Sequence, residues 1–256
     1  MLAAHALPAG LCQGFTAGQL ERLFGEPADT AIEIAHAQGL GFVAEHGRYF
    51  PSTCFQSIEE AVFCIVDIET NGSKPDKHQI IEIGAVKVRN RIIVDRFESL
   101  VRCTKISPHI TEITGIDTVA TENAPPMNEV LTLFKQFLGD AVFVGHDVKF
   151  DFGFTSQMME KAGMAPLLNR QLCTIDLAER TISAYRYGLS FLNEQLDLYE
   201  EANHHRALSD ALTTAKLFKK TLKHIPETVK TVEELIAFSK RAKRLKRPKL
   251  PPQTEG

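Results

Sequence analysis

Two carboxylates stand two residues apart at the end of an apolar run in the first third of the chain. The run AVFCIVDIET ends with Asp67 and Glu69, and in an extended strand such a pair points to the same face. Neighbouring carboxylates beside apolar residues repel each other, so one takes up a proton unless cations keep both ionised. Carboxylate oxygens favour Mg²⁺ or Mn²⁺. Taken alone, such a pair is more often a polar strand end than a catalytic site.

Two further acids and a histidine occur at the predicted starts of helices. Asp151 lies in VGHDVKFDFGF, where a strand gives way to a helix, and Asp147 in the same segment is a competing candidate. Asp210 begins an apolar helical stretch in NHHRALSDALTTAKLF, five residues after His205. Each has a simpler explanation, because the helix dipole favours acids at an N-terminus and a histidine in a polar loop is usually solvated. No one of them identifies a site by itself.

The segment that must position these residues, 60–224, alternates strand and helix patterns. The continuous apolar run at 62–66 predicts a buried central strand. The β-rich runs QIIEIGAVKV and RIIVDRFESLV, separated only by Arg89 and Asn90, predict an antiparallel hairpin, so the sheet is expected to be mixed. Apolar residues at helical spacing after a Pro-Pro pair predict a helix over 127–138. Further strands are predicted in AVFVGH and QLCTID, and further helices over 151–162 and in two or three segments before Leu222.

Smaller segments flank this region on both sides. Residues 1–55 contain two short helical patterns, at 17–26 and 28–38, followed by GFVAEHGRYF, which has the pattern of a hairpin. Helix, helix, hairpin is the order of a small winged-helix module, and an extension that simply packs on the main domain explains it equally well. Residues 228–256 contain a helix with a Thr-x-x-Glu capping box in TVEELIAFSKRAKRLK and then a basic tail. Three units are therefore predicted.

Charge is spread unevenly along the chain. The net charge is −3, and residues 240–256 hold seven basic side chains and one acidic one, a net +6, which leaves −9 for the rest. An acidic body argues against a protein that binds nucleic acid by bulk charge, because non-specific affinity comes mainly from lysine and arginine. The basic tail suits DNA or an acidic partner such as a polymerase, and a solvated charge run explains it equally well.

The chain has neither a membrane-spanning pattern nor a disulfide pattern. No run of about 18 apolar residues occurs, and the first residues lack the basic start of a secretory signal, so a cytoplasmic protein that does not enter a membrane is expected. The cysteines are odd in number, widely spaced and without a CxxC pair, which predicts isolated thiols rather than a disulfide framework or a zinc site. They are Cys12, Cys54, Cys64, Cys103 and Cys173.

The order of the acidic and histidine motifs carries more information than any one of them. Asp-x-Glu on the first strand, then Phe-Asp at 150–151, then His-x-x-x-x-Asp before a terminal helix resemble the three motifs of the DEDD-type exonucleases with a catalytic histidine. This superfamily includes the epsilon proofreading subunit of bacterial DNA polymerase III. QIIEIGAVKV, ITGI at 113–116 and LCTIDLAER add to the resemblance, which covers residues 61–220. It implies an α/β, ribonuclease-H-like fold with a mixed five-stranded sheet flanked by helices.

The resemblance also implies a reaction and its residues. It implies a 3′→5′ exonuclease that uses two divalent metal ions, Mg²⁺ or Mn²⁺, for which Asp67 would bridge both ions. Glu69, Asp151 and Asp210 would complete the metal cluster, and His205 would take the proton from the attacking water. Two metal ions suit phosphodiester cleavage because they activate water and neutralise transition-state charge. His205 is preferred to His204 because it alone has the five-residue offset to the last acid.

Substrate-binding candidates lie after the first motif and in a later loop. Thr70, Asn71 and Gly72 follow the metal strand and could offer amides or side-chain groups to a terminal nucleotide. His109 and Thr114 fall where the family's loop approaches the 3′ end. The substrate that the resemblance implies is a single-stranded or frayed DNA 3′ end, with a replicative polymerase subunit as a partner. RNA is the rival substrate, since no residue reports on a 2′-hydroxyl.

Two other interpretations compete with parts of this one. QLDLY at 195–199 resembles the short sliding-clamp-binding peptide of bacterial replication proteins, but Leu192, Leu196 and Leu198 are more simply explained as core residues. A nucleic-acid-binding or scaffold protein with a vestigial nuclease fold would place the function in residues 1–55. The intact acids and histidine argue against that hypothesis, because a retired site has no chemical need to keep five costly polar groups.

Overall fold

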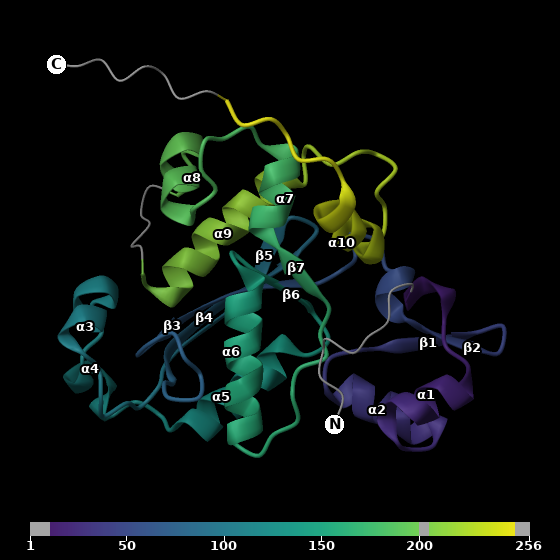
Figure 1. Cartoon of the computed structure of the whole chain (residues 1–256), viewed down its shortest axis with the longest axis horizontal. Helices are drawn as coiled ribbons and strands as arrows, with labels where there is room; N and C mark the ends of the chain where they lie inside the picture. The colour runs from purple at the N-terminus through teal and green to yellow at the C-terminus, as the bar shows by residue number, and fades with distance from the viewer. Residues whose placement is uncertain (1–10, 200–204, 249–256) are drawn as a thin grey trace.

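A mixed sheet of five strands forms the centre of the molecule (Figure 1). The computed structural model describes residues 11–199 and 205–248. The strand order is β5-β4-β3-β6-β7, in which β3 pairs antiparallel with β4 and parallel with β6. The strands are β3 (Phe63–Thr70), β4 (Ile80–Arg89), β5 (Ile92–Leu100), β6 (Val142–Gly145) and β7 (Gln171–Cys173). The predicted mixed sheet, with its β4–β5 hairpin, is confirmed.

Helices cover both faces of this sheet. Figure 1 shows α5 and α6 below the sheet, α7 to α10 above it, and α3 and α4 at the left. The bounds are α3 (Pro108–Thr114), α4 (Thr118–Glu122), α5 (Met127–Leu138), α6 (Val148–Lys161), α7 (Thr174–Thr181), α8 (Leu189–Leu196), α9 (Ala207–Thr221) and α10 (Val232–Arg241). The predicted α/β class is confirmed. No described helix has both the length and the apolar character needed to cross a membrane.

The central strand β3 separates two hydrophobic clusters. Phe63 and Ile65 pack in a cluster with buried residues of α9 and α10, whereas Cys64 and Val66 pack in a cluster with buried residues of α5 and α6. Because side chains alternate along a strand, residues 67 and 69 continue the row that faces α9. The apolar alternation of β3 therefore decides which helices its terminal acids meet.

Three element boundaries differ from the sequence prediction. The β4–β5 turn consists of Asn90 and Arg91, with φ of 48° and 61°, rather than Arg89 and Asn90. A two-residue hairpin turn of this kind needs positive φ at both central residues. Helix α6 begins at Val148, three residues earlier than predicted. Strand β7 ends at Cys173, so the last three residues of QLCTID begin α7.

Helices α3 and α4 were not predicted from the sequence. Both are short, with 7 and 5 residues, so neither shows a repeating apolar face. Their N-terminal signals are nevertheless regular: the Ser107 side chain accepts a hydrogen bond from the N–H of Ile110 and Pro108 follows it, and the Asp117 side chain accepts one from Ala120. Such N-caps are the sequence feature that could have located them.

The N-terminal segment has the predicted order of helix, helix and hairpin. It consists of η2 (Leu11–Gln13), α1 (Ala17–Phe24), α2 (Ala28–Ala37), β1 (Phe42–Glu45), β2 (Arg48–Pro51) and η3 (Ser52–Cys54). This N-terminal module packs on the main domain: Leu40 and Leu168 share a buried cluster, and the N–H of Leu168 donates to the carbonyl of Gln38. The likeness to a winged-helix module stays a prediction.

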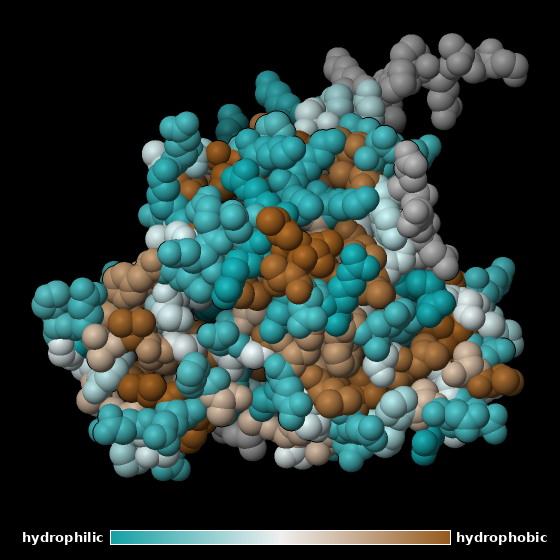
Figure 2. Space-filling view, turned by 180° about the vertical axis from the view of Figure 1, so that it is seen from behind, coloured by the Kyte–Doolittle hydropathy of each residue, from teal (hydrophilic) through white to brown (hydrophobic). Residues whose placement is uncertain are grey.

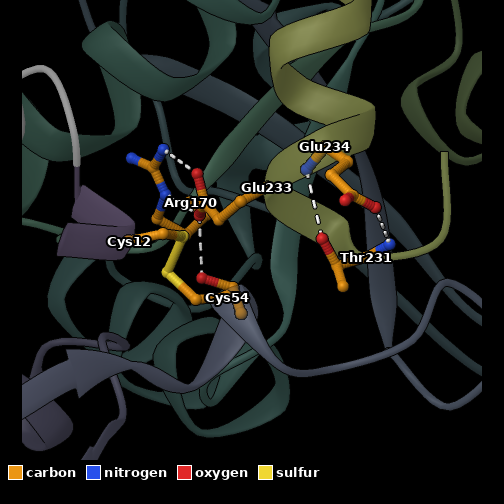
Figure 3. Close-up of a disulfide and its surroundings, with 7 residues drawn as sticks. Cys12, Cys54, Arg170, Thr231, Glu233 and Glu234 are labelled. Carbon is orange, nitrogen blue, oxygen red and sulfur yellow. Dashed lines mark hydrogen bonds and ion pairs between the residues drawn. A yellow bond between two sulfur atoms is a disulfide. The ribbon is translucent and has the colours of Figure 1, made fainter. Parts of the chain in front are cut away.

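A disulfide joins Cys12 and Cys54, so the prediction of five isolated thiols was wrong for this pair (Figure 3). The two residues are 42 apart in sequence, and the fold of the N-terminal module brings their Cα atoms to 5.6 Å. Sequence spacing alone could not reveal this, because the contact depends on how η2 and η3 pack. The remaining thiols are unpaired: Cys64 and Cys103 are buried and Cys173 is half-buried.

Beside the disulfide, a polar network ties the N-terminal module to α10 and to Arg170, the residue before β7 (Figure 3). Thr53 donates to a carboxylate oxygen of Glu233 at 2.8 Å, and the Arg170 Nη2 donates to the other oxygen at 2.8 Å. The predicted capping box opens α10, because Thr231 accepts from the N–H of Glu234 while Glu234 accepts from the N–H of Thr231. Hydrogen bonds thus hold together Thr53, Arg170 and Glu233, which are far apart in the sequence.

The described part of the basic segment docks on α7. Arg244 and Arg247 both pair with Glu179, at 2.8 and 3.2 Å, and Leu245 donates its N–H to the Glu179 carbonyl. These residues thus pair with Glu179 of the same chain, and binding of the tail to DNA or to an acidic partner stays a prediction. Residues 249–256 lie outside the described part of the chain.

Strand β5 forms one edge of the sheet and exposes apolar side chains. Ile92 and Val94 are 62% and 55% exposed. Figure 2 shows the face turned away in Figure 1, where hydrophobic side chains gather in a patch among hydrophilic ones. Exposed charged residues along the same strand, Asp95, Arg96 and Glu98, oppose pairing with another sheet, since charge is a usual protection of an exposed edge.

The disulfide is expected to stabilise the N-terminal module. Closing a loop of 42 residues lowers the entropy of the unfolded chain and is worth up to about 4 kcal/mol. Cys54→Ser should therefore lower the unfolding midpoint in urea under oxidising conditions, whereas Cys173→Ser, at a half-buried free thiol, should change it little. Equal midpoints for wild type and Cys54→Ser, with and without dithiothreitol, would contradict a stabilising disulfide.

Candidate active site

The first two acids of the site lie at the end of β3, on the face that α9 covers. Asp67 and Glu69 are half-buried, and they pair in register with Gly84 and Glu82 of β4. The register shifts directly after Glu69, where the strand pairing skips one residue. Such a bulge re-aims a side chain at a strand end. The predicted common face of the two carboxylates is confirmed by the alternation of β3.

Asp151 reaches the same place from the opposite face of the sheet. It is 5% exposed and lies in the first turn of α6. Its carboxylate accepts a hydrogen bond from the backbone N–H of Ile68. This N–H points to the β6 side, as the bond from Val142 N–H to the Val62 carbonyl shows, but β6 ends at Gly145. The Asp151 carboxylate thus accepts the hydrogen bond that a longer β6 would have accepted, and it lies beside the two acids of β3.

Gly145 makes room for this approach. A Cβ atom at this position would lie 3.0 Å from Asp151 Oδ2 and 3.0 Å from the Cα of Val148. A side chain here would therefore push the carboxylate away from β3. Asp147, the competing candidate, is exposed, precedes α6 with a φ of 87°, and makes no capping hydrogen bond. The structure places Asp151, and not Asp147, beside the strand acids.

Helix α9 lies directly on the backbone of β4. A Cβ atom at Gly84 would come within 2.1 Å of the backbone nitrogen of Leu208 and 2.2 Å of the carbonyl carbon of Ala207. Since Gly84 is opposite Asp67 in the strand register, the first turn of α9 sits above the strand acids. Only glycine permits this approach.

A buried carboxylate fixes the start of α9. Glu82 is fully buried and accepts hydrogen bonds from the N–H of Ala207 at 2.9 Å and from Arg206 Nη2 at 2.7 Å and Nε at 3.2 Å. Sequence reasoning missed both residues. The signal was present: one acid stands in the otherwise apolar run QIIEIGAV, and a basic residue directly follows His205.

His205 and Asp210 meet Glu69 at this point. The N–H of His205 donates to Asp210 Oδ2 at 2.9 Å, and one ligand atom from each of Glu69, His205 and Asp210 lies within 4.8 Å of the other two. His205 has a φ of +63°, a conformation that costs a non-glycine residue about 1 kcal/mol or more. Asp210 is buried, whereas His205 is exposed. His204 lies outside the described residues, so the preference for His205 stays a prediction.

The carboxylates of the site repel one another strongly. Burial, followed by the charges of Asp210 and Glu82, raises the pKa of Glu69 to about 8, and Arg206 opposes this rise. Burial, followed by the charge of Asp151, raises the pKa of Asp67 well above its usual value.

The pKa of Asp151 is also raised well above its usual value, mainly by burial and by the charge of Asp147. A cluster of this kind ionises fully only with additional positive charge beside it. Its donors are carboxylate oxygens and one imidazole, which fit hard divalent cations. The residues present therefore suit the predicted metal ions.

Of the substrate-binding candidates, Thr70, Asn71 and Gly72 directly follow Glu69 of the candidate metal cluster. Thr70 ends β3, and the Asn71 side chain connects two loops, because it accepts from the N–H of Gln79 and donates to the carbonyl of Lys105. Gly72 has a φ of 155°, and a Cβ atom there would lie 2.5 Å from the His78 ring. The two hydrogen bonds of the Asn71 side chain hold the loop after β3 in its conformation.

His109 and Thr114 lie in helix α3 and not in the loop expected for them. His109 is exposed, whereas Thr114 is buried; its hydroxyl donates to the carbonyl of Ile110 and accepts from the N–H of Ile116. The side chain of Thr114 thus has a role in ending α3. Its use in substrate binding stays a prediction.

The QLDLY segment belongs to the core of the domain. Leu192 and Leu198 are buried in one cluster, and Leu196 packs against it. Tyr199 donates its N–H to Asn193, and its ring lies under Lys216 Nζ at 4.3 Å. The leucines of the segment are packed inside the domain, as the interpretation of them as core residues predicts.

Comparison with known sequences points to one family. A family model of RNase T-type exonucleases matches residues 64–218. DNA polymerase III of the PolC type from Staphylococcus haemolyticus is 36% identical over 174 residues, which are 67% of this chain and 12% of that protein. The same enzyme from Staphylococcus aureus strain MW2 is 36% identical over 172 residues, 66% of this chain and 12% of that protein. The chain thus spans a small part of the length of these relatives.

Comparison with solved structures points to the same fold. Exonuclease X in complex with 5′-overhanging duplex DNA has a TM-score of 0.55 and 25% identity, covering 69% of this chain and 99% of that one. The zinc-bound form of the E. coli exonuclease I–ssDNA complex has a TM-score of 0.59 and 16% identity, covering 66% of this chain and 42% of that one. The predicted ribonuclease-H-like fold is confirmed.

Placement of α9 by Gly84 should control metal binding. Gly84→Ala forces a Cβ atom into the backbone of Ala207 and Leu208, so α9 must move and carry His205 and Asp210 away from Glu69. We expect the affinity for Mn²⁺, measured by calorimetric titration, to fall about 10-fold or more, with a loss of about 1–3 kcal/mol in unfolding free energy.

Gly153→Ala is the matched control. Nothing lies within 4 Å of a Cβ atom at Gly153 in α6, and alanine favours a helix by up to about 1 kcal/mol over glycine. This variant should bind Mn²⁺ like wild type and be at least as stable. Equal Mn²⁺ affinities for the two variants would show that the position of α9 does not matter for the cluster.

Proposed function

Because the chain belongs to the RNase T family of exonucleases, we propose that it removes nucleotides from the 3′ ends of DNA in a reaction that depends on divalent metal ions. The DEDD-type membership predicted from the sequence is confirmed by this family and its relatives. The observation that carries the finer proposal is the convergence of β3, α6 and α9, which brings Glu69, His205 and Asp210 together beside Asp67 and Asp151.

Each residue of the site has a part in the proposed reaction. Asp67, Glu69, Asp151 and Asp210 hold divalent cations, for which we propose Mg²⁺ or Mn²⁺. When bound, a pair of such ions activates water and neutralises the charge that develops on the phosphoryl group. His205, exposed at the rim of the cluster, takes the proton from the attacking water, since an imidazole nitrogen in its neutral form accepts a proton.

The geometry of α9 supports His205 as that base. Its N–H is held by Asp210 Oδ2 at 2.9 Å, and Arg206, the next residue, is held by the buried Glu82. Two neighbouring anchors fix the backbone on either side of the imidazole. A base must lie within hydrogen-bond reach of the proton that it takes, and these anchors hold the His205 backbone in place for that transfer.

DNA is the substrate that the relatives favour. The sequence relatives are DNA polymerases, and the similar structures include one in complex with 5′-overhanging duplex DNA and one with ssDNA. We therefore propose a proofreading role with a replicative polymerase, carried out on single-stranded or frayed 3′ ends. Since the matched region is 12% of each PolC-type relative, the polymerase partner is part of the proposal. RNA remains the alternative substrate.

The proposal places the protein in the cytoplasm. Cytoplasmic thiols are kept reduced, so Cys12 and Cys54 would be held there as a dithiol. Thr53 and Arg170 would then hold the N-terminal module to Glu233 without the disulfide. We further propose that residues 60–224 form the exonuclease domain. Residues 1–55 are its N-terminal extension, and residues 228–256 are its C-terminal helix and tail.

Two neighbouring acids provide a direct test of the site. Asp151→Asn removes the carboxylate that lies beside β3, and hydrolysis of 5′-labelled single-stranded DNA in Mg²⁺ should fall by about 10³-fold or more. Asp147→Asn removes the same charge four residues earlier, at an exposed position without a capping bond, and should keep most of the activity. The readout is the ladder of products shortened from the 3′ end.

Three results would contradict the proposal. Equal rates for Asp151→Asn and wild type would refute the site. Labelled mononucleotide released first from the 5′ end would refute the direction. Faster hydrolysis of an RNA strand of the same sequence and length would move the protein to RNA processing.

A further inference from the structure

A cavity of about 640 Å³ opens beside the end of β3. It is walled by the loop after β3, the segment after β5, the start of α5 and the end of α6, and it falls within the range of about 300–1,000 Å³ of ordinary ligand sites. Its lining includes Asn71, Lys77, Lys105, Met127, Met158 and Lys161. The metal cluster described above uses none of these residues.

The lining combines an apolar floor with a positively charged rim. Met158 is 4% exposed and Met127 is half-buried, whereas Lys77, Lys105 and Lys161 are exposed. Three lysines and one aspartate line the cavity, so its formal charge is positive, although the chain outside the basic segment is acidic. Apolar surface for bases and ammonium groups for phosphates are the two features that bind single-stranded nucleic acid.

The lysines of the rim are available for phosphates. Within residues 11–199 and 205–248, no ion pair is formed by Lys77, Lys105 or Lys161. Lys161 donates to the carbonyl of Pro75, which brings the end of α6 to the loop after β3 and leaves two of its N–H donors. The three lysines thus line a shared cavity and form no ion pair with a carboxylate of the described residues.

The cavity adjoins the metal cluster along two elements. Asn71, in its wall, follows Glu69 by two residues. Helix α6 carries Asp151 in its first turn and Lys161 at its end, ten residues apart, which is about 15 Å along a helix. Figure 1 shows α6 leading from the sheet down past α5. A strand whose 3′ end lies at the cluster can therefore reach the cavity within a few nucleotides.

The charges around the cluster favour a path of the substrate strand toward the cavity. The charge of Asp147, directly before α6, reaches Asp151, and the charge of Glu98, in β5, reaches Arg206 directly before α9. An incoming phosphate backbone is repelled there and attracted toward the lysines. We propose that this cavity binds the substrate strand on the 5′ side of the cleaved nucleotide, with Lys77, Lys105 and Lys161 contacting phosphates. This inference rests on the proposed function, since it assigns the path of that same substrate.

Two substrates of different length separate the cavity from the cluster. Thymidine 5′-monophosphate p-nitrophenyl ester fills only the cluster, whereas a 15-nucleotide single-stranded DNA also reaches the cavity. In Lys105→Gln/Lys161→Gln, KM for the DNA should rise about 10-fold with kcat unchanged, and the slope of log KM against log salt should fall by about 1.4 for two lost phosphate contacts. Both constants for the ester should be those of wild type.

Matched variants control for charge and for folding. Lys223→Gln/Lys230→Gln removes the same charge at exposed positions outside the cavity and should leave KM for the DNA unchanged. Lys105→Arg/Lys161→Arg keeps the charge and should restore wild-type KM. Binding of the same DNA, labelled with fluorescein at its 5′ end, is also measured by anisotropy without divalent metal, so that the cavity is tested apart from hydrolysis.

The outcomes decide between the cavity and the proposed function. Equal DNA affinities for wild type and Lys105→Gln/Lys161→Gln overturn the cavity assignment, as does an equal rise in KM for DNA and ester, which indicates a distorted cluster. A wild type that binds the DNA more tightly than this variant but hydrolyses neither substrate supports the cavity and contradicts the proposed function.

Discussion

The contact between the first turn of α9 and the backbone of β4 is the constraint on which the candidate site depends. Helix and strand approach so closely that a single Cβ atom at Gly84 would overlap the helix backbone. The buried Glu82 completes this contact by accepting from the N–H of Ala207 and from Arg206. A buried ion pair contributes little net stability by itself, because desolvation offsets its attraction. Its effect here is to fix where α9 begins, and therefore where the histidine and the last acid of the site lie.

The other half of the site comes from the opposite face of the sheet. Strand β6 ends before β3, so the N–H of Ile68 is left for the carboxylate of Asp151. The acids thus meet where β3 extends beyond its parallel neighbour, between two helical layers that the alternation of β3 holds apart. Their mutual repulsion is the cost of this arrangement: burial and neighbouring charge raise the pKa of Glu69 to about 8. Divalent cations would offset that repulsion.

Local sequence patterns predicted most of the strands and helices. The features that they missed depend on contacts between residues far apart in the sequence. The apolar run before Asp67 predicted a central strand with two acids on one face, and the capping box of α10 was read directly from Thr231 and Glu234. The Glu82–Arg206 pair spans 124 residues and the Cys12–Cys54 disulfide spans 42. Neither separation leaves a periodic trace in the sequence, because each pair meets only after the elements have packed. Family resemblance supplied the order of the five site residues, which single-residue arguments had left ambiguous.

In the proposed function, side chains from β3, α6 and α9 form a single metal-binding cluster. The most direct measurement is anomalous diffraction at the manganese edge from crystals grown with Mn²⁺. We expect anomalous peaks from Mn²⁺ ions coordinated by Asp67, Glu69, Asp151 and Asp210. Peaks bound only at other acids, such as Asp176, or no peak beside β3 at millimolar Mn²⁺, would contradict it.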